Sequence, residues 1–318
     1  MKAGFIGYRN FAQRLKSVFE LSGEVREFLF YHPEKDVTYL KSTRNFNDLL
    51  NCDFIVISSP DWTHGRYLRS LKDYEGYIFC EKIPVLNSED LLFLKRHNNP
   101  YIYYDFNYRK SLLYDILKEH ENEVLYVGHR YSVGIALREA YKSNWRSDSH
   151  KAPLGVFQLS GIHLFDLLIF CFGRPTAYNV SMRNISPYGD SVDNFKISME
   201  FKNGIFSELF FSYTAPYQYS LNIVTTEKLF ESDGSSFVVR GPRETLDENG
   251  LFSAPHVTSE KAINIYENSL KESVQYFLDS VKNRNKISES FMENNLLSTE
   301  LFLEIIENNK HFINYKSS

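Results

Sequence analysis

The chain has 318 residues, of which 43% are hydrophobic, and its 36 basic and 40 acidic side chains give it a formal net charge of −4. This length is enough for two domains with separate cores, and the interspersed charges exclude the basic field of a nucleic-acid-binding protein. The sequence contains no run of about 18 apolar residues that would span a membrane, and its first residues lack the pattern of a secretion signal. We therefore expect a cytoplasmic protein that binds neither nucleic acid nor a membrane.

Strands and helices alternate over the first third of the chain. Apolar runs predict the strands, and apolar residues at helical spacing predict helices between them. We expect strands at residues 2–7, 25–31, 52–60, 77–82 and 101–106, and helices at residues 11–22, 67–75 and 89–97. Ser88 is expected to cap the last of these helices. Strands connected by helices of this length are typical of right-handed crossovers, so we predict an α/β domain with a Rossmann-type, doubly wound parallel sheet.

The pattern changes at about residue 120, where alternating apolar and polar residues begin to indicate antiparallel strands. Two such runs flank Asn203 and Gly204, a pair that predicts a hairpin turn. Further strands are expected at residues 124–134, 221–226 and 235–240, an apolar helix at 161–172, and a helical tail from 269. We predict a dinucleotide-binding domain at residues 1–120 and a substrate-binding α+β domain with a mostly antiparallel open sheet at residues 121–318. Because one face of that sheet would be exposed, we expect a homo-oligomer, either a dimer or a tetramer, formed through it.

The three cysteines, Cys52, Cys80 and Cys171, lie far apart within apolar segments. This arrangement is typical of reduced core cysteines in a cytosolic protein. The histidines and acidic residues show none of the close spacings that metal ligands use, so we expect no metal site.

The segment GFIGYRNFA, residues 4–12, lies where the first strand meets the first helix. In a dinucleotide-binding fold, this turn directs backbone N–H groups and the helix N-terminus at a pyrophosphate. Gly7 takes the first glycine position of that fingerprint, whereas Arg9 replaces the second glycine and Ala12 the third. The guanidinium of Arg9 is able to contact a phosphate directly, and an ordinary tight turn is the alternative interpretation. The expected cofactor contacts are Gly7, Tyr8, Arg9, Asn10, Phe11 and Ala12.

An acidic residue normally follows the second strand and binds the ribose diol of NAD. Here Tyr31 and His32 stand at the strand end, and Glu34 follows only after a proline. The cofactor is therefore either NAD or NADP, with Tyr31 and His32 expected beside its adenosine ribose. A short exposed loop without a cofactor contact is the alternative.

Three further motifs lie at the ends of successive predicted strands: ISSPDWTH at residues 57–64, CEKIP at 80–84 and DFNYR at 105–109. Ligands bind at this edge of an open α/β sheet. A fourth motif, GVFQLSGIHLFDLLIFCFG, begins a helix of the second domain and puts His163 and Asp166 one turn apart on one face. In this order, the motifs resemble those of the glucose–fructose oxidoreductase, inositol dehydrogenase and rhizopine-catabolism (Gfo/Idh/MocA) family. The resemblance extends over nearly the whole chain.

The resemblance implies roles for particular residues. Glu81 would approach the nicotinamide ribose, Lys82 would contact both the cofactor and the reacting hydroxyl, and His163 falls on the family's active-site histidine. The turn at the end of the predicted strand 52–60 would line the nicotinamide side of the cofactor. The residues expected there are Ser58, Ser59, Pro60, Asp61 and His64. Substrate contacts are expected from Asn107, Arg109, Trp145, Arg146 and Asp166. Two of these, Asn107 and Arg109, are equally suited to joining the domains, and the position of Asp166 commonly packs its helix in the family.

The implied activity is hydride transfer between NAD or NADP and a hydroxyl-bearing carbon of a sugar, sugar derivative, nucleotide sugar or cyclitol. Oxidation of an alcohol requires a group that removes the hydroxyl proton, and a histidine with a pKa of about 6.5 does this near neutral pH. A lysine ammonium stabilises the developing alkoxide. Lys82 and His163 are therefore the expected catalytic residues; a lysine that reaches solvent and a core histidine are the alternatives.

Three residues depart from the family pattern. Arg9 replaces a glycine, Ile83 separates the lysine from the proline, and Leu159 occupies the position of an aspartate that would orient the histidine. Such losses would also suit a family member that binds the cofactor and regulates a protein partner, or one that acts as a scaffold. A reductase of the biliverdin reductase type is a further alternative, but this type lacks the motif that contains His163.

Overall fold

The computed structural model describes residues 1–37, 39–242, 246–287 and 294–309. Contacts within the chain divide it into two units: residues 1–110 with 269–303, and residues 111–268 with those from 304 onward. These two units differ from the two predicted domains, which were divided at residue 120. The reason is that helix α4 (Leu112–Glu119) packs against α5 (Ile162–Phe172), while most of α6 (Ile265–Asn283) packs against the first sheet.

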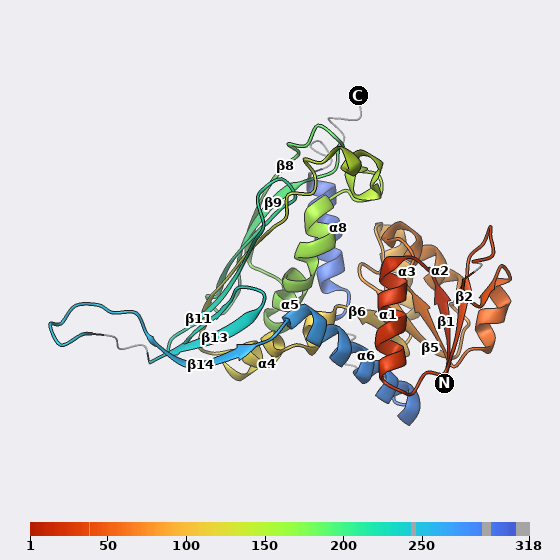
Figure 1. Ribbon diagram of the computed structural model, residues 1–318, viewed down its shortest axis with the longest axis horizontal. Helices are drawn as coiled ribbons and strands as arrows, with labels where there is room; N and C mark the ends of the chain where they lie inside the picture. Colours follow the sequence, from red (N-terminus) through yellow and green to blue (C-terminus); the bar gives the residue numbers. More distant parts are fainter. Residues whose placement is uncertain (38, 243–245, 288–293, 310–318) are drawn as a thin grey trace. The chain divides into compact units, whose positions relative to one another are not determined.

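The sheet of the first unit is parallel throughout, with the strand order β3-β2-β1-β4-β5-β6 (Figure 1). Its strands are β1 (Lys2–Ile6), β2 (Glu27–Tyr31), β3 (Ser42–Thr43), β4 (Phe54–Ile57), β5 (Tyr77–Glu81) and β6 (Ile102–Asp105). Its other helices are α1 (Asn10–Leu21), α2 (His64–Ser70) and α3 (Ser88–His97), with the 3₁₀ turns η1 (Phe46–Asn51), η2 (Asp61–Thr63) and η3 (Asn107–Lys110). The predicted doubly wound sheet is confirmed. The strand order reverses between β1 and β4, where such sheets bind ligands.

One face of this sheet is covered through aromatic side chains. The ring of Phe277 in α6 lies 5.2 Å from those of Phe54 and Phe79, edge-on in both cases. Phe19 in α1 packs against Phe54 at 5.3 Å, and all four side chains are buried completely. Burial of a phenylalanine contributes roughly 1.5–3 kcal/mol, so this cluster fixes α1 and α6 firmly on the strands that carry the candidate site.

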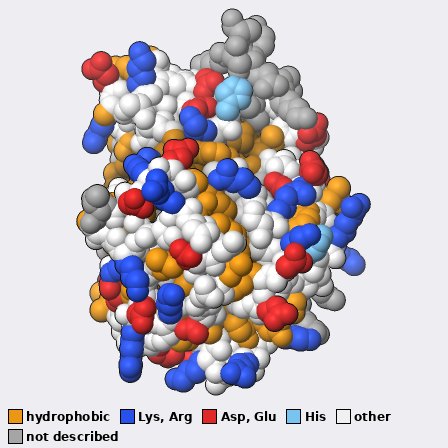
Figure 2. All heavy atoms as spheres, turned by 90° about the vertical axis from the view of Figure 1, so that its right-hand side faces the viewer, with side chains coloured by type: hydrophobic (Ala, Val, Ile, Leu, Met, Phe, Trp, Pro, Cys, Tyr) orange, Lys and Arg blue, Asp and Glu red, His pale blue; other side chains and the backbone are white. Residues whose placement is uncertain are grey.

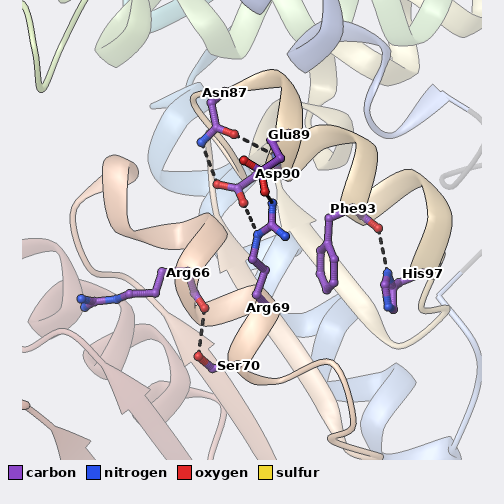
Figure 3. A network of polar contacts seen from close by, with 8 residues as sticks. All are labelled: Arg66, Arg69, Ser70, Asn87, Glu89, Asp90, Phe93 and His97. Atoms are coloured by element: carbon purple, nitrogen blue, oxygen red, sulfur yellow. Dashed lines mark hydrogen bonds and ion pairs between the residues drawn. The ribbon is translucent and has the colours of Figure 1, made fainter.

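A polar network joins α2 to α3 (Figure 3). Arg69 in α2 pairs with two acids in the first turn of α3, one of which is Asp90. The prediction that Ser88 caps α3 is wrong: the cap is Asn87, whose side-chain oxygen accepts a hydrogen bond from the Asp90 N–H at 2.8 Å. A Cβ added to Gly65 would lie 2.1 Å from a carboxylate oxygen of Asp90, so a larger residue there would displace the carboxylate from the network. The network holds together the segments that follow β4 and β5.

The second unit contains an eight-stranded sheet with the order β14-β13-β12-β11-β7-β10-β9-β8 (Figure 1). Its strands are β7 (Val124–Ser132), β8 (Ala177–Arg183), β9 (Asn194–Glu200), β10 (Phe206–Ser212), β11 (Gln218–Thr225), β12 (Leu229–Ser232), β13 (Ser236–Gly241) and β14 (His256–Ala262). Among the described strands of this sheet only β7 and β10 pair in parallel, so the predicted mostly antiparallel sheet is confirmed. The predicted hairpin joins β9 to β10, and Gly204 in its turn has a φ of +80°.

One face of the second sheet is covered by the apolar helix that the sequence predicts. A π-helical turn, η6 (Phe157–Gly161), leads into α5, and the ring of Phe157 stacks on Phe195 of β9 at 4.0 Å. The other elements here are the 3₁₀ turns η4 (Glu139–Ser143) and η5 (Trp145–Ser147), and α8 (Leu297–Asn308), which begins in the first unit and ends in the second.

The surface carries mixed charge. On the face shown in Figure 2, acidic and basic side chains alternate around small apolar areas without a field of one sign. Among the described residues, no helix combines the length and the apolar character that crossing a bilayer requires.

Candidate cofactor and active-site residues

The turn between β1 and α1 brings two strands of the first sheet close together. Gly7 has a φ of +115°, and a Cβ added there would lie 2.7 Å from the backbone oxygen of Ser58. Glycine alone fits both this backbone conformation and this approach. Ala12 in α1 is 1% exposed, as close packing of the helix on the strand requires. Both residues therefore serve the turn geometry of a dinucleotide-binding fold.

The N-terminus of α1 is open. Arg9 is the N-cap residue but makes no side-chain capping bond within the described part of the chain, and both Arg9 and Asn10 are exposed. The first N–H groups of this 12-residue helix are therefore accessible to an anion, which the helix dipole also favours. The turn suits a pyrophosphate, and the individual contacts assigned to residues 7–12 stay predictions.

Tyr8 and His32 lie against each other beside the end of β2, with ring centroids 5.4 Å apart. The Nδ1 atom of His32 accepts hydrogen bonds from the backbone N–H groups of Glu34 and Lys35, at 3.1 and 3.3 Å. A hydrogen bond from Lys35 lowers the pKa of Tyr8, and Arg9 acts in the same direction. Burial lowers the pKa of His32, and the charges of Lys35 and Arg9 add to this effect. The neutral imidazole therefore donates from Nε2.

Tyr31, the other residue expected beside the adenosine ribose, packs into an aromatic cluster. Its ring lies 5.3 Å from that of Phe46 and 6.3 Å from that of Tyr67. Burial raises the pKa of Tyr31, so its hydroxyl stays protonated. A polar contact from Tyr31 to a cofactor stays a prediction.

His64 fastens the turn after β4 to the turn after β5. Its side chain is completely buried, with Nδ1 2.9 Å from the Ile83 carbonyl oxygen and Nε2 2.7 Å from that of Ser59. A carbonyl oxygen only accepts, so both contacts are hydrogen bonds when both ring nitrogens carry hydrogen. Asp61, in the same turn as Pro60, is buried as well, whereas Pro60 is exposed. His64 therefore shapes the site by joining its two turns.

Three ionisable side chains are buried at the carboxyl ends of β5 and β6. Glu81 is in register with Asp105 on the neighbouring strand, and Lys82 follows Glu81 directly. The exposed fractions of Glu81, Lys82 and Asp105 are 9%, 6% and 1%. Burial raises the pKa of Glu81 well above its usual value, against the lowering effect of the Lys82 charge. For the same reason the pKa of Asp105 rises to about 7, although Ser273 and Lys82 oppose the shift.

Asp105 and its partner Ser273 are site residues that the sequence analysis missed. The Ser273 hydroxyl on α6 donates to Asp105 Oδ1 at 2.5 Å and lies 2.7 Å from the Tyr103 hydroxyl. All three side chains are buried. The available signal was an aspartate at the end of an otherwise apolar strand, the same signal that marks Glu81. Because a carboxyl with a pKa near 7 exchanges its proton at physiological pH, this edge of the sheet is suited to proton chemistry beside a lysine.

Asn107 and Arg109 lie in η3 and are each 1% exposed. Arg109 donates to the side-chain and backbone oxygens of Asn295, and its guanidinium lies 4.7 Å from the ring centroid of Phe106. These contacts support a structural role for Arg109. Asn107 donates from Nδ2 to the Ser269 hydroxyl at 3.0 Å, while its Oδ1 has no hydrogen-bond partner among the described residues. Asn107 therefore carries a buried acceptor, and its contact with a substrate stays a prediction.

In the second unit, Leu159 lies in η6 and His163 in the first turn of α5. His163 is 6% exposed, and the ring of Tyr266 packs edge-on against it at 5.4 Å. Asp166 is completely buried, as a residue that packs the helix would be. Lys82 and His163 belong to different units, and that they face one cavity stays a prediction.

Trp145 and Arg146 form a stacked pair in η5. The guanidinium carbon of Arg146 lies 4.6 Å from the Trp145 ring. The hydroxyl of Tyr213 hydrogen bonds to Ser160 and to Arg146, although burial still raises the pKa of Tyr213. Since Ser160 follows Leu159 in η6, Arg146 lies close to the turn that leads to His163. Its proposed contact with a substrate stays a prediction.

The described residues contain no group of three or more histidine, cysteine and acidic side chains placed to hold a metal ion. Within the described part of the chain, no cysteine forms a disulfide; Cys52 and Cys80 are buried, and burial raises the pKa of both thiols. Thiols of this kind are protonated near neutral pH and therefore unreactive.

Comparison with known proteins gives one family match and several structural neighbours. The model of the GFO/IDH/MocA C-terminal domain matches residues 123–241. Levoglucosan dehydrogenase in complex with NADH and levoglucosan is 15% identical, with a TM-score of 0.77 over 94% of each chain. GenD2 from gentamicin A biosynthesis, in complex with NAD, is 15% identical, with a TM-score of 0.74 over 96% of this chain and 92% of its own. An oxidoreductase from Desulfitobacterium hafniense, described as putative and NADPH-dependent, is 15% identical, with a TM-score of 0.75 over 94% of each chain.

No curated protein matches the sequence. At 15% identity the structural neighbours establish the fold, and they do so over nearly the whole chain. The family match is independent of them, and it covers the second sheet from β7 to β13. Residues 123–241 match the model of the GFO/IDH/MocA C-terminal domain, which supports the resemblance to this family that the ordered motifs predict.

Proposed function

We propose that the protein is an NAD(P)-dependent oxidoreductase that transfers a hydride to or from a hydroxyl-bearing carbon. The observation that carries this proposal is a lysine, Lys82, buried with Glu81 and Asp105 at the carboxyl edge of the first sheet. Charged side chains are rarely buried in this way unless they are paired or functional. At the same edge, the Gly7 turn and the open N-terminus of α1 suit the pyrophosphate of a dinucleotide.

A nicotinamide ring bound at this edge would accept or supply the hydride. In the oxidation direction, the substrate carbon loses a hydride and its hydroxyl loses a proton, which leaves a carbonyl group. We assign removal of the proton to the imidazole of His163, and stabilisation of the negative charge on the oxygen to the ammonium of Lys82. The charge of Lys82 acts on both Glu81 and Asp105, since it lowers the pKa of each against the effect of burial. In the reduction direction, the same groups return the proton.

The proposed substrates are polyhydroxylated: a sugar, a sugar derivative, a nucleotide sugar or a cyclitol. Two neighbours support this class, since one was solved with levoglucosan and the other comes from gentamicin A biosynthesis. In this chain, Trp145 offers an apolar ring face and Arg146 a cation, both of which suit a sugar. Ile83 and Leu159, which depart from the family motifs, are expected to change how Lys82 and His163 are oriented.

Replacement of Lys82 by methionine tests the assignment. We expect Lys82→Met to lower kcat by at least about 10²-fold, because the variant keeps the bulk of the side chain but loses the charge that stabilises the oxyanion. Turnover is measured from the absorbance of the reduced nicotinamide over a panel of sugars and cyclitols, and urea denaturation verifies that the variant folds. The matched control is Lys72→Met, at an exposed lysine before the start of β5, which should keep full turnover. Wild-type turnover in Lys82→Met would refute the role of Lys82.

A second candidate function is that of a cofactor-binding regulator. The observation in its favour is Leu159, which supplies no carboxylate at the position where the family has one. Tight binding of NAD or NADP without turnover on any member of the panel would support this candidate over the enzyme. Failure to bind either cofactor would favour a scaffold.

A further inference from the structure

We propose that the adenosine end of the cofactor site selects a 2′-phosphate, so that the chain binds NADP(H) in preference to NAD(H). The inference rests on the proposed function and specifies its cofactor. Four side chains at the ends of β1 and β2 carry it, and we call them the 2′-phosphate cluster: Tyr8, Arg9, His32 and Lys35.

The end of β2 lacks the residue that would favour NAD. In a dinucleotide-binding sheet this strand end lies beside the adenosine ribose, where a carboxylate binds the ribose diol of NAD. The same carboxylate would repel a 2′-phosphate. Here β2 ends at Tyr31, His32 follows it, and the first acid is Glu34, which is exposed and lies beyond a proline.

Arg9 and Lys35 place two cations at this position. Both side chains are exposed, both interact with the Tyr8 hydroxyl, and Lys35 Nζ lies 5.4 Å from the centroid of the Tyr8 ring. Within the described part of the chain neither cation forms an ion pair with a carboxylate, whereas Arg44, which follows β3, is paired with Asp36 at 3.5 Å. A phosphate is a stronger acceptor than a phenol hydroxyl, so it would gain charge-assisted hydrogen bonds from both cations.

His32 adds a donor and holds the loop in place. Since its Nδ1 accepts from the backbone N–H groups of Glu34 and Lys35, the neutral ring carries its hydrogen on Nε2. The same two bonds turn the loop back on the strand end and bring Lys35 to Tyr8. The cluster is therefore formed before a ligand binds, which reduces the entropy lost on binding.

The test is calorimetric titration of the full chain with two pairs of ligands, each pair differing by a 2′-phosphate: NADP against NAD, and 2′,5′-ADP against 5′-AMP. We expect the phosphorylated member of each pair to bind at least about tenfold more tightly. Lys35→Ala should weaken NADP binding by about tenfold and change NAD binding by less than about twofold. Arg9→Ala should weaken NADP binding more than NAD binding. Because both cations are exposed, the preference should shrink as salt is added.

The charge-matched control is Lys72→Ala, which should leave all four affinities unchanged. Glu34→Gln tests the competing arrangement, because it would weaken NAD binding if this carboxylate held the ribose diol. Equal affinity for NAD and NADP, or equal losses for both in Lys35→Ala, would overturn the 2′-phosphate site and leave the proposed function intact. Binding of neither cofactor would overturn both.

Discussion

The carboxyl of Asp105 should make the stability of the protein depend on pH. Burial raises its pKa to about 7, whereas an aspartate in an unfolded chain titrates near ~3.9. The folded state therefore binds this proton more tightly than the unfolded state does. The resulting contribution to the free energy of unfolding is complete below about pH 4 and is lost as the pH rises to about 7. A shift of this size corresponds to at most about 4 kcal/mol.

Asp105→Asn should remove this dependence, because the amide oxygen still accepts from Ser273 but the group does not ionise. Relative to the wild type, the variant should gain up to a few kcal/mol in free energy of unfolding between about pH 5 and about pH 8. Urea denaturation at the two pH values measures the difference. Asp73→Asn, at a carboxylate that is 89% exposed, is the control and should follow the wild type. An Asp105→Asn curve parallel to that of the wild type would contradict the assigned ionisation.

The sequence predicts individual site residues where a charged side chain interrupts an apolar run. Glu81 and Lys82 stand out in the sequence for this reason, and Asp105 carries the same signal in the next strand. The sequence does not show which groups these side chains meet. Ser273 is an ordinary serine, 168 positions from Asp105, and only the return of α6 to the first sheet brings the two together. The link that His64 makes to Ile83 depends in the same way on tertiary structure.

At the scale of elements, the contact between the turns after β4 and β5 depends on His64, so the stability of the protein should fall when this side chain is lost. We expect His64→Ala to lower the free energy of unfolding by about 2–4 kcal/mol, because it leaves a cavity and removes the ring that contacts a carbonyl group in each of the two turns. Turnover should fall too, since the turns at Ser59 and Ile83 are released. Urea denaturation compares this variant with His97→Ala, at an exposed histidine in α3 (Figure 3) that should cost less than about 1 kcal/mol. Equal losses in the two variants would mean that His64 does not join the turns.

The sequence predicts a strand or helix where the element's own residues form an apolar pattern. Strands β1, β4 and β5 are nearly continuous apolar runs, as expected of parallel strands covered on both faces. Strand β14 was not predicted, because all of its residues are exposed and it has no apolar face. Its place is set by pairing with β13 rather than by its own pattern. Strand β3 has two residues, too few for any periodicity, and neither β8 nor β12 was predicted.

At the scale of the whole molecule, the order of the motifs predicted both sheets, but the pattern change near residue 120 does not define the units. Helix α6 follows the second sheet in sequence and yet packs its Phe277 on the first. Its apolar spacing indicates a buried face without indicating which sheet covers it. The partner of an amphipathic helix is decided by tertiary packing, and the local sequence does not record it.

The second sheet also leads to a prediction about assembly. Its inner face is covered through Phe157 and Phe195, whereas Phe206 in β10 and Tyr217 before β11 are 56% and 70% exposed. Large aromatic side chains exposed on one unit are typical of an interaction surface. We therefore expect the chain to form a homo-oligomer through this sheet, so that light scattering gives a multiple of the 37.3 kDa chain mass.

The variant that tests this surface is Phe206→Asp, which should weaken self-association by at least about tenfold because it puts a charge where an apolar contact is expected. Leu21→Asp, at a residue of α1 that is 80% exposed, makes the same chemical change in the first unit and should leave the mass unchanged. A wild-type mass of 37.3 kDa at all concentrations would show that the chain is a monomer and that the exposed aromatic residues serve another purpose. Loss of mass in both variants would instead place the interface outside the second sheet or spread it over both units.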